Sequence, residues 1–193
     1  MRKSILAVVF VFVCVAMSLP ELAFGDAVVS VSSPATVSQG ATFAVDVDIA
    51  EVIDLFAYQL DLNFNPSILQ ATGTITEGGF FQSGGGFVPG TIDNTLGSIT
   101  SNADTLLGPG PGIDGNGTLI EFQFLAVGAG TSVLDLANII LLDSTLSNID
   151  FTSTNASVTV TGSGPVPTPE PSTLMLLASA SGPLALFWIL KKL

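Results

Sequence analysis

Apolar side chains recur at every second position in three long stretches of this chain, residues 43–49, 56–64 and 120–124. Successive side chains of a β-strand point to opposite faces, so a period of two predicts strands with one buried face. Six shorter stretches, most of them separated by Gly, Pro, Asn or Asp, are further strand candidates: residues 28–32, 68–75, 98–102, 132–136, 139–142 and 156–160. About nine strands without a convincing amphipathic helix predict an all-β fold, a single jelly-roll β-sandwich over residues 26–160.

The start of the chain has the composition of a secretory signal. Two basic residues precede an apolar run over residues 5–17, and small residues stand three and one positions before Asp26. This pattern predicts a signal helix within residues 1–25, cleaved between Gly25 and Asp26. Cys14, the one cysteine, lies inside the apolar run, so the processed protein forms no disulfide.

The end of the chain has three parts: Pro169-Glu170-Pro171, a mostly apolar stretch over residues 174–190, and two lysines before the final leucine. A stretch of ~17 residues is at the low end of what a membrane-spanning helix needs, and the lysines favour the cytoplasmic side. The arrangement in residues 169–193 resembles the PEP-CTERM sorting signal of Gram-negative bacteria. That resemblance implies processing by an exosortase-type protease.

Together the two ends predict a protein exported by a Gram-negative-type bacterium. The C-terminal helix is expected to hold an inner-membrane intermediate, which is then released to the cell surface or the extracellular matrix. The alternative is a plain C-terminal membrane anchor that is never cut. Residues 161–168 are rich in Gly, Ser and Pro and are predicted to form a linker between the sandwich and the sorting motif.

Charge is distributed very unevenly along the chain. All four basic residues lie in the two terminal segments, whereas fourteen of the sixteen acidic residues lie between them. Nucleic acid and anionic lipid surfaces are therefore excluded as direct partners of the central domain, because both are bound through cationic side chains. Divalent cations and basic protein surfaces remain as complementary partners. An acidic surface that only keeps an exported domain soluble is the alternative.

The side-chain inventory argues against an enzyme. Residues 26–168 contain no His, Cys, Lys or Arg, which excludes Ser-His-Asp and Cys-His arrangements and Schiff-base chemistry. Zinc and the later transition metals are disfavoured because their usual His and Cys ligands are absent. We therefore predict a non-catalytic domain without a cofactor.

The segment Asp114-Gly115-Asn116-Gly117 is the one candidate for a metal loop. Asp114 and Asn116 have oxygen ligands of the kind that Ca²⁺ prefers, but the spacing departs from the EF-hand pattern after Asn116 and no bidentate Glu follows at the required distance. The two glycines suit a turn with positive φ. A turn is the main prediction, with calcium as a weaker alternative.

Four segments occur in an order that is typical of one family: residues 37–45 (VSQGATFAV), 56–69 (FAYQLDLNFNPSIL), 117–124 (GTLIEFQF) and 155–160 (NASVTV). This order resembles the cohesin domain, a β-sandwich module known from cellulosome scaffolds. The resemblance implies a sandwich that docks a dockerin-type partner through one sheet face.

In that family the outward positions of the strand ending at the Asn-Pro corner contribute polar contacts to the partner. Carried over to this chain, these positions are Ala57, Gln59, Asp61 and Asn63. Gln59, Asp61 and Asn63 could make such contacts, whereas Ala57 could not. The corner itself departs from the family, because Phe64-Asn65 stands where Tyr-Asp is usual. A solvated strand face without a partner is the alternative interpretation of these three residues.

Two further functions compete with protein docking. A carbohydrate-binding module linked to exopolysaccharide or polysaccharide breakdown needs exposed aromatic rings, and Phe80, Phe81 and Phe87 are the candidates. These rings are expected instead to cover one end of the sandwich core. The other competitor is a structural matrix protein without a specific ligand.

Overall fold

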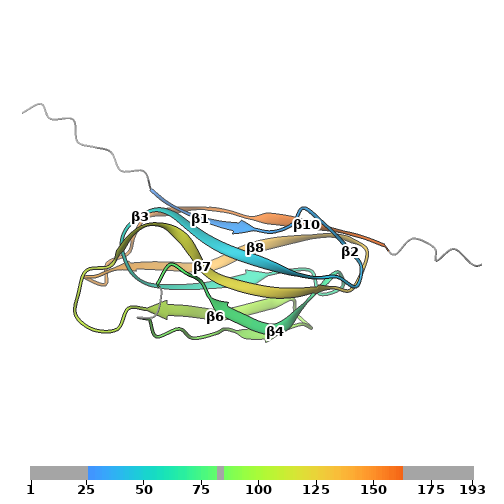
Figure 1. The fold of residues 1–193 in the computed structure, drawn as a ribbon, viewed down its shortest axis with the longest axis horizontal. Helices are drawn as coiled ribbons and strands as arrows, with labels where there is room; N and C mark the ends of the chain where they lie inside the picture. Colours follow the sequence, from blue (N-terminus) through green and yellow to red (C-terminus); the bar gives the residue numbers. More distant parts are fainter. Residues whose placement is uncertain (1–25, 82–84, 163–193) are drawn as a thin grey trace, which may run out of the picture.

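The computed structural model describes residues 26–81 and 85–162, and these form a β-sandwich (Figure 1). The strands are β1 (Ala27–Ser32), β2 (Thr36–Ser38), β3 (Thr42–Asn63), β4 (Leu69–Glu77), β5 (Thr91–Asp93), β6 (Ser98–Thr105), β7 (Ile113–Ala126), β8 (Gly130–Asp143), β9 (Phe151–Thr154) and β10 (Ala156–Thr161). Within the described residues there is no helix, and so none long and apolar enough to cross a membrane. The predicted all-β sandwich is confirmed, while the predicted signal and C-terminal helices lie outside the described residues.

The long strand β3 belongs to both layers of the sandwich. Its first half pairs with β1 and β7, and these strands continue outward to β9 and β4. Its second half pairs with β6 and β8, and β6 continues to the short edge strand β5. The first residues of β8 pair with β10, which also pairs with β2. The runs 43–49 and 56–64, which the alternation predicted as two strands, are therefore one continuous strand.

The passage of β3 between the layers is irregular. Glu51 and Asp54 have φ angles of 57° and 59°, which is the left-handed region that non-glycine residues rarely adopt. Two side chains of β7 hold this backbone. The amide of Glu51 donates to Asn116 Oδ1 at 2.7 Å, and the amide of Asp54 donates to Asp114 Oδ1 at 2.7 Å. These hydrogen bonds satisfy donors that the interrupted ladder leaves free.

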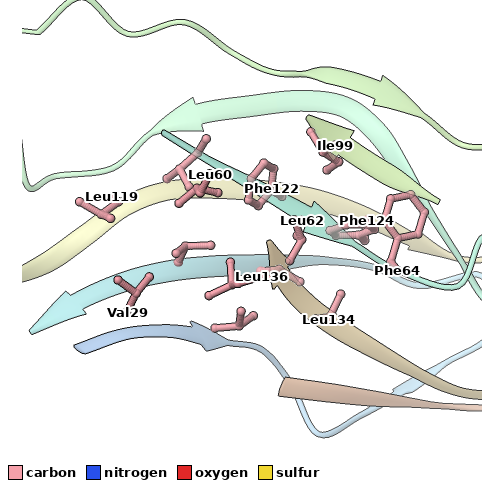
Figure 2. Packing of buried hydrophobic residues seen from close by; sticks show 14 of the residues in the cluster. Val29, Leu60, Leu62, Phe64, Ile99, Leu119, Phe122, Phe124, Leu134 and Leu136 are labelled. Carbon is pink, nitrogen blue, oxygen red and sulfur yellow. The ribbon is translucent and has the colours of Figure 1, made fainter. Parts of the chain in front are cut away.

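The core lies between the two layers, where the inward side chains of both meet (Figure 2). Alternate residues of β3 are buried over most of its length, as the period-two pattern predicts. Side chains that are less than 2% exposed and fill the centre include Ile49, Leu55, Leu60, Leu62, Leu69, Ile99, Leu119, Ile120, Phe122, Phe124, Leu134 and Leu141. Removing this apolar area from water, at roughly 25 cal/mol per Å², is the main favourable term in holding the layers together.

One predicted turn is wrong. Residues 114–117 lie inside the continuous strand β7 instead of forming a turn before it. Gly115 does have a positive φ of 120°, but it lies opposite Val52, at the irregular middle of β3. Gly115 lies where the register between β3 and β7 shifts, and its positive φ accommodates that shift. A turn and a strand irregularity both call for a positive φ, so the sequence did not distinguish them.

Candidate functional site

A shallow hollow of about 310 Å³ lies on the outer face of the layer formed by β8, the second half of β3, and β6. We call it the alanine hollow, because Ala57 of β3 and Ala103 of β6 lie at its centre. The other residues that line it are Tyr58, Gln59, Gly86, Val88, Asp104, Thr105, Ile140 and Leu142.

Strand register explains why the hollow forms at this position. Ala57 lies between Thr105 of β6 and Leu142 of β8, and Gln59 lies between Ala103 and Ile140 in the same way. Ala103 in turn lies between Gln59 and Val88. Because each alanine has a larger residue on both sides, the surface is hollowed where the alanines lie. A Leu or Phe in place of either alanine would fill it.

The rim of the hollow exposes apolar side chains. Val88 is 55% exposed and Ile140 is 43% exposed. Leu107 is 71% exposed, and its Cδ2 lies 3.5 Å from the Cβ position that a side chain at Gly86 would have, which places it at the same rim. Contiguous exposed apolar surface beside polar residues is typical of binding sites for proteins or ligands.

The segment that carries Gly86 and Val88 is held against the outer edge of β6. The amide of Gly86 donates to the carbonyl of Thr105 at 2.7 Å, and Val88 exchanges backbone hydrogen bonds with Ala103. This segment forms one wall of the alanine hollow. The hollow therefore depends on pairing between β6 and a short chain segment rather than on a long strand.

Asp61 does not point freely outward as the alternation predicted. Its side chain is only 8% exposed, and both carboxylate oxygens accept hydrogen bonds. Oδ1 accepts from the amide of Ser101 at 2.6 Å, and Oδ2 accepts from Asn138 Nδ2 at 2.6 Å. The backbones of Ser101 and Asn138 have φ angles of 62° and 50°, at irregularities in β6 and β8. Asp61 thus holds two β-bulges, one on each side of β3.

The other two predicted contact residues lie on the face itself. Gln59 lines the alanine hollow, and Asn63 lines a second hollow of about 350 Å³ farther along the same layer. Asn63 is paired in register with Asp135 of β8. Gln59 and Asn63 thus lie on either side of the buried Asp61, and a partner covering this face would contact both.

The residues that the sequence interpretation missed are mainly on β6 and β8. Ala103, Thr105, Ile140 and Leu142 all line the hollow. The strand predicted at residues 98–102 ended too early to include Ala103 and Thr105. Two adjacent apolar residues, Ile139 and Ile140, gave no indication of which one faced outward.

The structure gives the weak calcium candidates another role. One oxygen each of Asp114 and Asn116 accepts a backbone amide from the irregular part of β3. Among residues 26–81 and 85–162, no group of three or more His, Cys, Asp or Glu side chains is arranged to hold a metal ion.

The aromatic residues considered for sugar stacking are mostly inside the sandwich. Phe80 is 8% exposed and Phe81 is 3% exposed. Phe81 stacks on Tyr58 with ring centroids 5.7 Å apart, and Phe87 is partly buried against the same core. The expectation that these rings cover one end of the core is confirmed, so they form no exposed platform.

The outer face of the other layer is acidic. Asp46 of β3 lies directly opposite Glu121 of β7, with Asp48 two residues further along β3. Partial burial, followed by the charges of Glu121 and Asp48, raises the pKa of Asp46. Gln123 and Thr118 donate hydrogen bonds to Glu121 and Asp48, whereas Asp46 Oδ1 is buried without a partner.

Comparison with known proteins identifies the family of this fold. A family model described as "Cohesin domain" matches residues 27–160. A search of curated protein sequences finds no match.

Several solved structures are similar to this chain. A non-cellulosomal cohesin from the archaeon Archaeoglobus fulgidus superposes with a TM-score of 0.59 at 18% identity, over 71% of this chain and 92% of the other. A type II cohesin domain from the cellulosome of Acetivibrio cellulolyticus gives a TM-score of 0.60 at 15% identity, over 69% and 95%. A chain of a type I cohesin–dockerin complex from Clostridium thermocellum gives a TM-score of 0.58 at 11% identity, over 71% and 100%.

Proposed function

The chain belongs to the cohesin domain family, since the family model matches residues 27–160, and on this basis we propose that the face around the alanine hollow docks a dockerin-type partner protein. The observation that carries the proposal is the hollow itself. An apolar depression with Ala57 and Ala103 at its centre and with exposed Val88 and Ile140 at its rim is suited to receive an apolar side chain. Cohesin domains are non-catalytic, and docking requires no catalytic group.

The rigidity of the strands beneath this face favours it as the docking surface. Its centre is built on three paired strands, and Asp61 fixes the bulges in the two outer strands. A face of this kind keeps its shape before binding, which lowers the entropy cost of association. Four of the structures similar to this chain are cohesin–dockerin complexes, so this fold supports docking in those proteins.

The negative charge of this domain restricts the charge that a partner surface can have. Residues 26–168 contain no Lys, Arg or His and fourteen acidic side chains. A partner surface that covers part of this domain must therefore be neutral or basic, because like charges brought together at an interface cost several kcal/mol. A second copy of the same domain is disfavoured for the same reason. We propose a partner with an apolar side chain for the hollow and basic residues around it.

The proposed location follows from the two ends of the chain. We propose that the protein is exported, held at the inner membrane by its C-terminal segment and released by an exosortase-type protease to the cell surface or matrix. A cut after Gly25 is compatible with the fold, because β1 begins at Ala27, which is buried and paired with β9, so the first strand is left whole. Intact-mass analysis of the cell-associated protein tests this. A mass that still includes Trp188 and Lys192 contradicts release.

One pair of variants tests the docking face. Ala57→Arg places a long cationic side chain in the hollow, and Ala44→Arg makes the same change on the same strand at an outward position of the opposite layer. Binding is measured by titrating the purified full-length chain, in non-ionic detergent, against a panel of dockerin modules from the same genome. We expect Ala57→Arg to weaken binding at least 100-fold and Ala44→Arg to change it less than threefold. Equal losses in both variants, or no binding by the unchanged chain, contradict the proposal.

A further inference from the structure

Asp104 is a buried carboxylate without a cationic partner. It lies on β6 opposite Tyr58 of β3 and is only 2% exposed. Its Oδ1 accepts the amide of Thr105 at 2.7 Å, whereas Oδ2 is buried and has no hydrogen-bond partner. A charged oxygen that is buried without a partner strongly destabilises the folded chain, so the carboxylate requires a proton or a cation.

The titratable groups near Asp104 are Tyr58, its partner in register, and Glu77 at the end of β4. Glu77 lies opposite Ile120 of β7, next to the Leu119 carbonyl that the Tyr58 hydroxyl contacts, so both acids lie beside the same phenol. Tyr58 donates its hydroxyl hydrogen to the carbonyl of Leu119 at 2.9 Å, so this hydrogen is not donated to Asp104. Glu77 has a buried oxygen of its own, Oε1, that also lacks a partner. No Lys, Arg or His between residues 26 and 168 is available to neutralise either group.

We propose that Asp104 and Glu77 share a single proton, so that the carboxyl group of one donates a hydrogen bond to the carboxylate of the other. One proton then satisfies both of the unpaired oxygens and removes one of the two negative charges. The proposal accounts for how two acids share a buried position in a domain without a basic side chain.

The titration behaviour agrees with this arrangement. Burial raises the pKa of Asp104 to about 6, and the Thr105 amide opposes the shift while Glu77 adds to it. Burial, together with the charges of Asp104 and Glu77, raises the pKa of Tyr58, so the phenol stays neutral. Asp104 therefore changes its protonation in the mildly acidic range.

The shared proton lies beneath a wall of the alanine hollow. A Cβ at Gly85 would lie 2.3 Å from Asp104 Oδ1, so the backbone of this segment packs directly on the carboxyl group. Gly85 and Val88 are bridged to Leu106 and Ala103, beside Asp104 on the chain. Loss of the proton introduces a second negative charge under this wall. The consequence for docking rests on the proposed function, whereas the sharing of the proton does not.

The direction of the pH effect follows from linkage. The folded chain holds the proton to a higher pH than the unfolded chain does, because the pKa of Asp104 is raised on folding. The contribution of the pair to stability is therefore present in full at low pH. It falls as the pH rises from about 4 through about 6, and then stays constant.

The test is the thermal midpoint of the full-length chain in non-ionic detergent between pH 4.5 and 7.5, for the unchanged chain, Asp104→Asn and Glu77→Gln. An amide at either position donates to the remaining carboxylate at every pH. We expect the unchanged chain to lose roughly 5 °C more than either variant over this range. Parallel curves for all three proteins overturn the proposal.

Two further measurements keep the test decisive. If 1 mM CaCl₂ at pH 7.5 raises the midpoint of the unchanged chain but not of Asp104→Asn, a cation and not a proton joins the pair, and the proposal is wrong. If both variants fail to fold, infrared spectra of Asp46→Asn, which lacks the other carboxyl group with a raised pKa, decide. A carboxylic acid band that persists at pH 5.5, where exposed Asp and Glu are ionised, supports the shared proton, and its absence contradicts it. None of these measurements uses a docking partner, so a failure of docking is recognised separately.

Discussion

The two outer faces of the sandwich differ in how they treat their acidic residues. On the β1–β3–β7 face, Asp46 lies opposite Glu121 with no cation near it, and its pKa is raised. On the β8–β3–β6 face, the acidic residue of the same strand, Asp61, is buried and accepts two hydrogen bonds. On the first face, neighbouring carboxylates repel one another, whereas on the second a carboxylate holds the backbone beneath an apolar surface. Net charge therefore says little about where a partner binds.

The largest expected effect separates these two aspartates. Asp61→Ala removes the acceptor of the Ser101 amide and the Asn138 side chain, so we expect a loss of about 3 kcal/mol in the free energy of unfolding. Asp46→Ala relieves repulsion from Glu121 and is expected to change stability by less than about 1 kcal/mol. Urea unfolding of the full-length chain measures both. A loss for Asp46→Ala as large as that for Asp61→Ala would remove the distinction between the faces.

A smaller effect concerns exposed isoleucines. Ile140 is 43% exposed at the rim of the hollow, and Ile53 is 44% exposed in the irregular part of β3 and does not line the hollow. Ile140→Ala removes apolar area that a partner would cover, so we expect about a tenfold loss of dockerin affinity, or roughly 1.4 kcal/mol. Ile53→Ala serves as the matched control and should stay within twofold in the same titration. A greater loss for Ile53→Ala would place the contact elsewhere.

The smallest expected effect is the pH dependence of the acidic face. The pKa of Asp46 is raised on folding, so its ionisation destabilises the folded chain as the pH rises above about 4. Asp46→Asn removes this titration. We expect the variant to exceed the unchanged chain by about 0.5 kcal/mol at pH 7 and to match it near pH 2.5, well below the ordinary pKa of Asp, where both are neutral at this position. An advantage that is equal at both pH values would show that charge is not the cause.

The sequence predicted the fold better than the site, and particular residues show why. Segments such as 43–49 and 120–124 bury alternate side chains over their whole length, so the period of two can be recognised in the sequence. Strand β9 has the sequence Phe-Thr-Ser-Thr, and β2 and β5 are three residues long, too short or too polar for a period to appear. Export and sorting remain predictions, because both terminal segments lie outside the described residues.

The site was harder to predict because it depends on irregularities. Leu60, Asp61 and Leu62 are all buried, since bulges in both neighbouring strands interrupt the alternation at this point. A strict period of two instead predicts that Asp61 faces outward. The centre of the hollow is formed by Ala57 and Ala103, and alanine gives no chemical signal of a site. Such a hollow becomes visible only when the strands are placed in register.

We expect the β8–β3–β6 face, and not the acidic face, to contact the partner. Hydrogen–deuterium exchange on the full-length chain, free and saturated with a dockerin module that binds it, tests this most directly. We expect slower exchange on binding in residues 57–63, 85–88, 103–107 and 138–142, with residues 28–32, 44–50 and 118–123 unchanged. Protection confined to residues 28–32, 44–50 and 118–123 would instead assign docking to the acidic face.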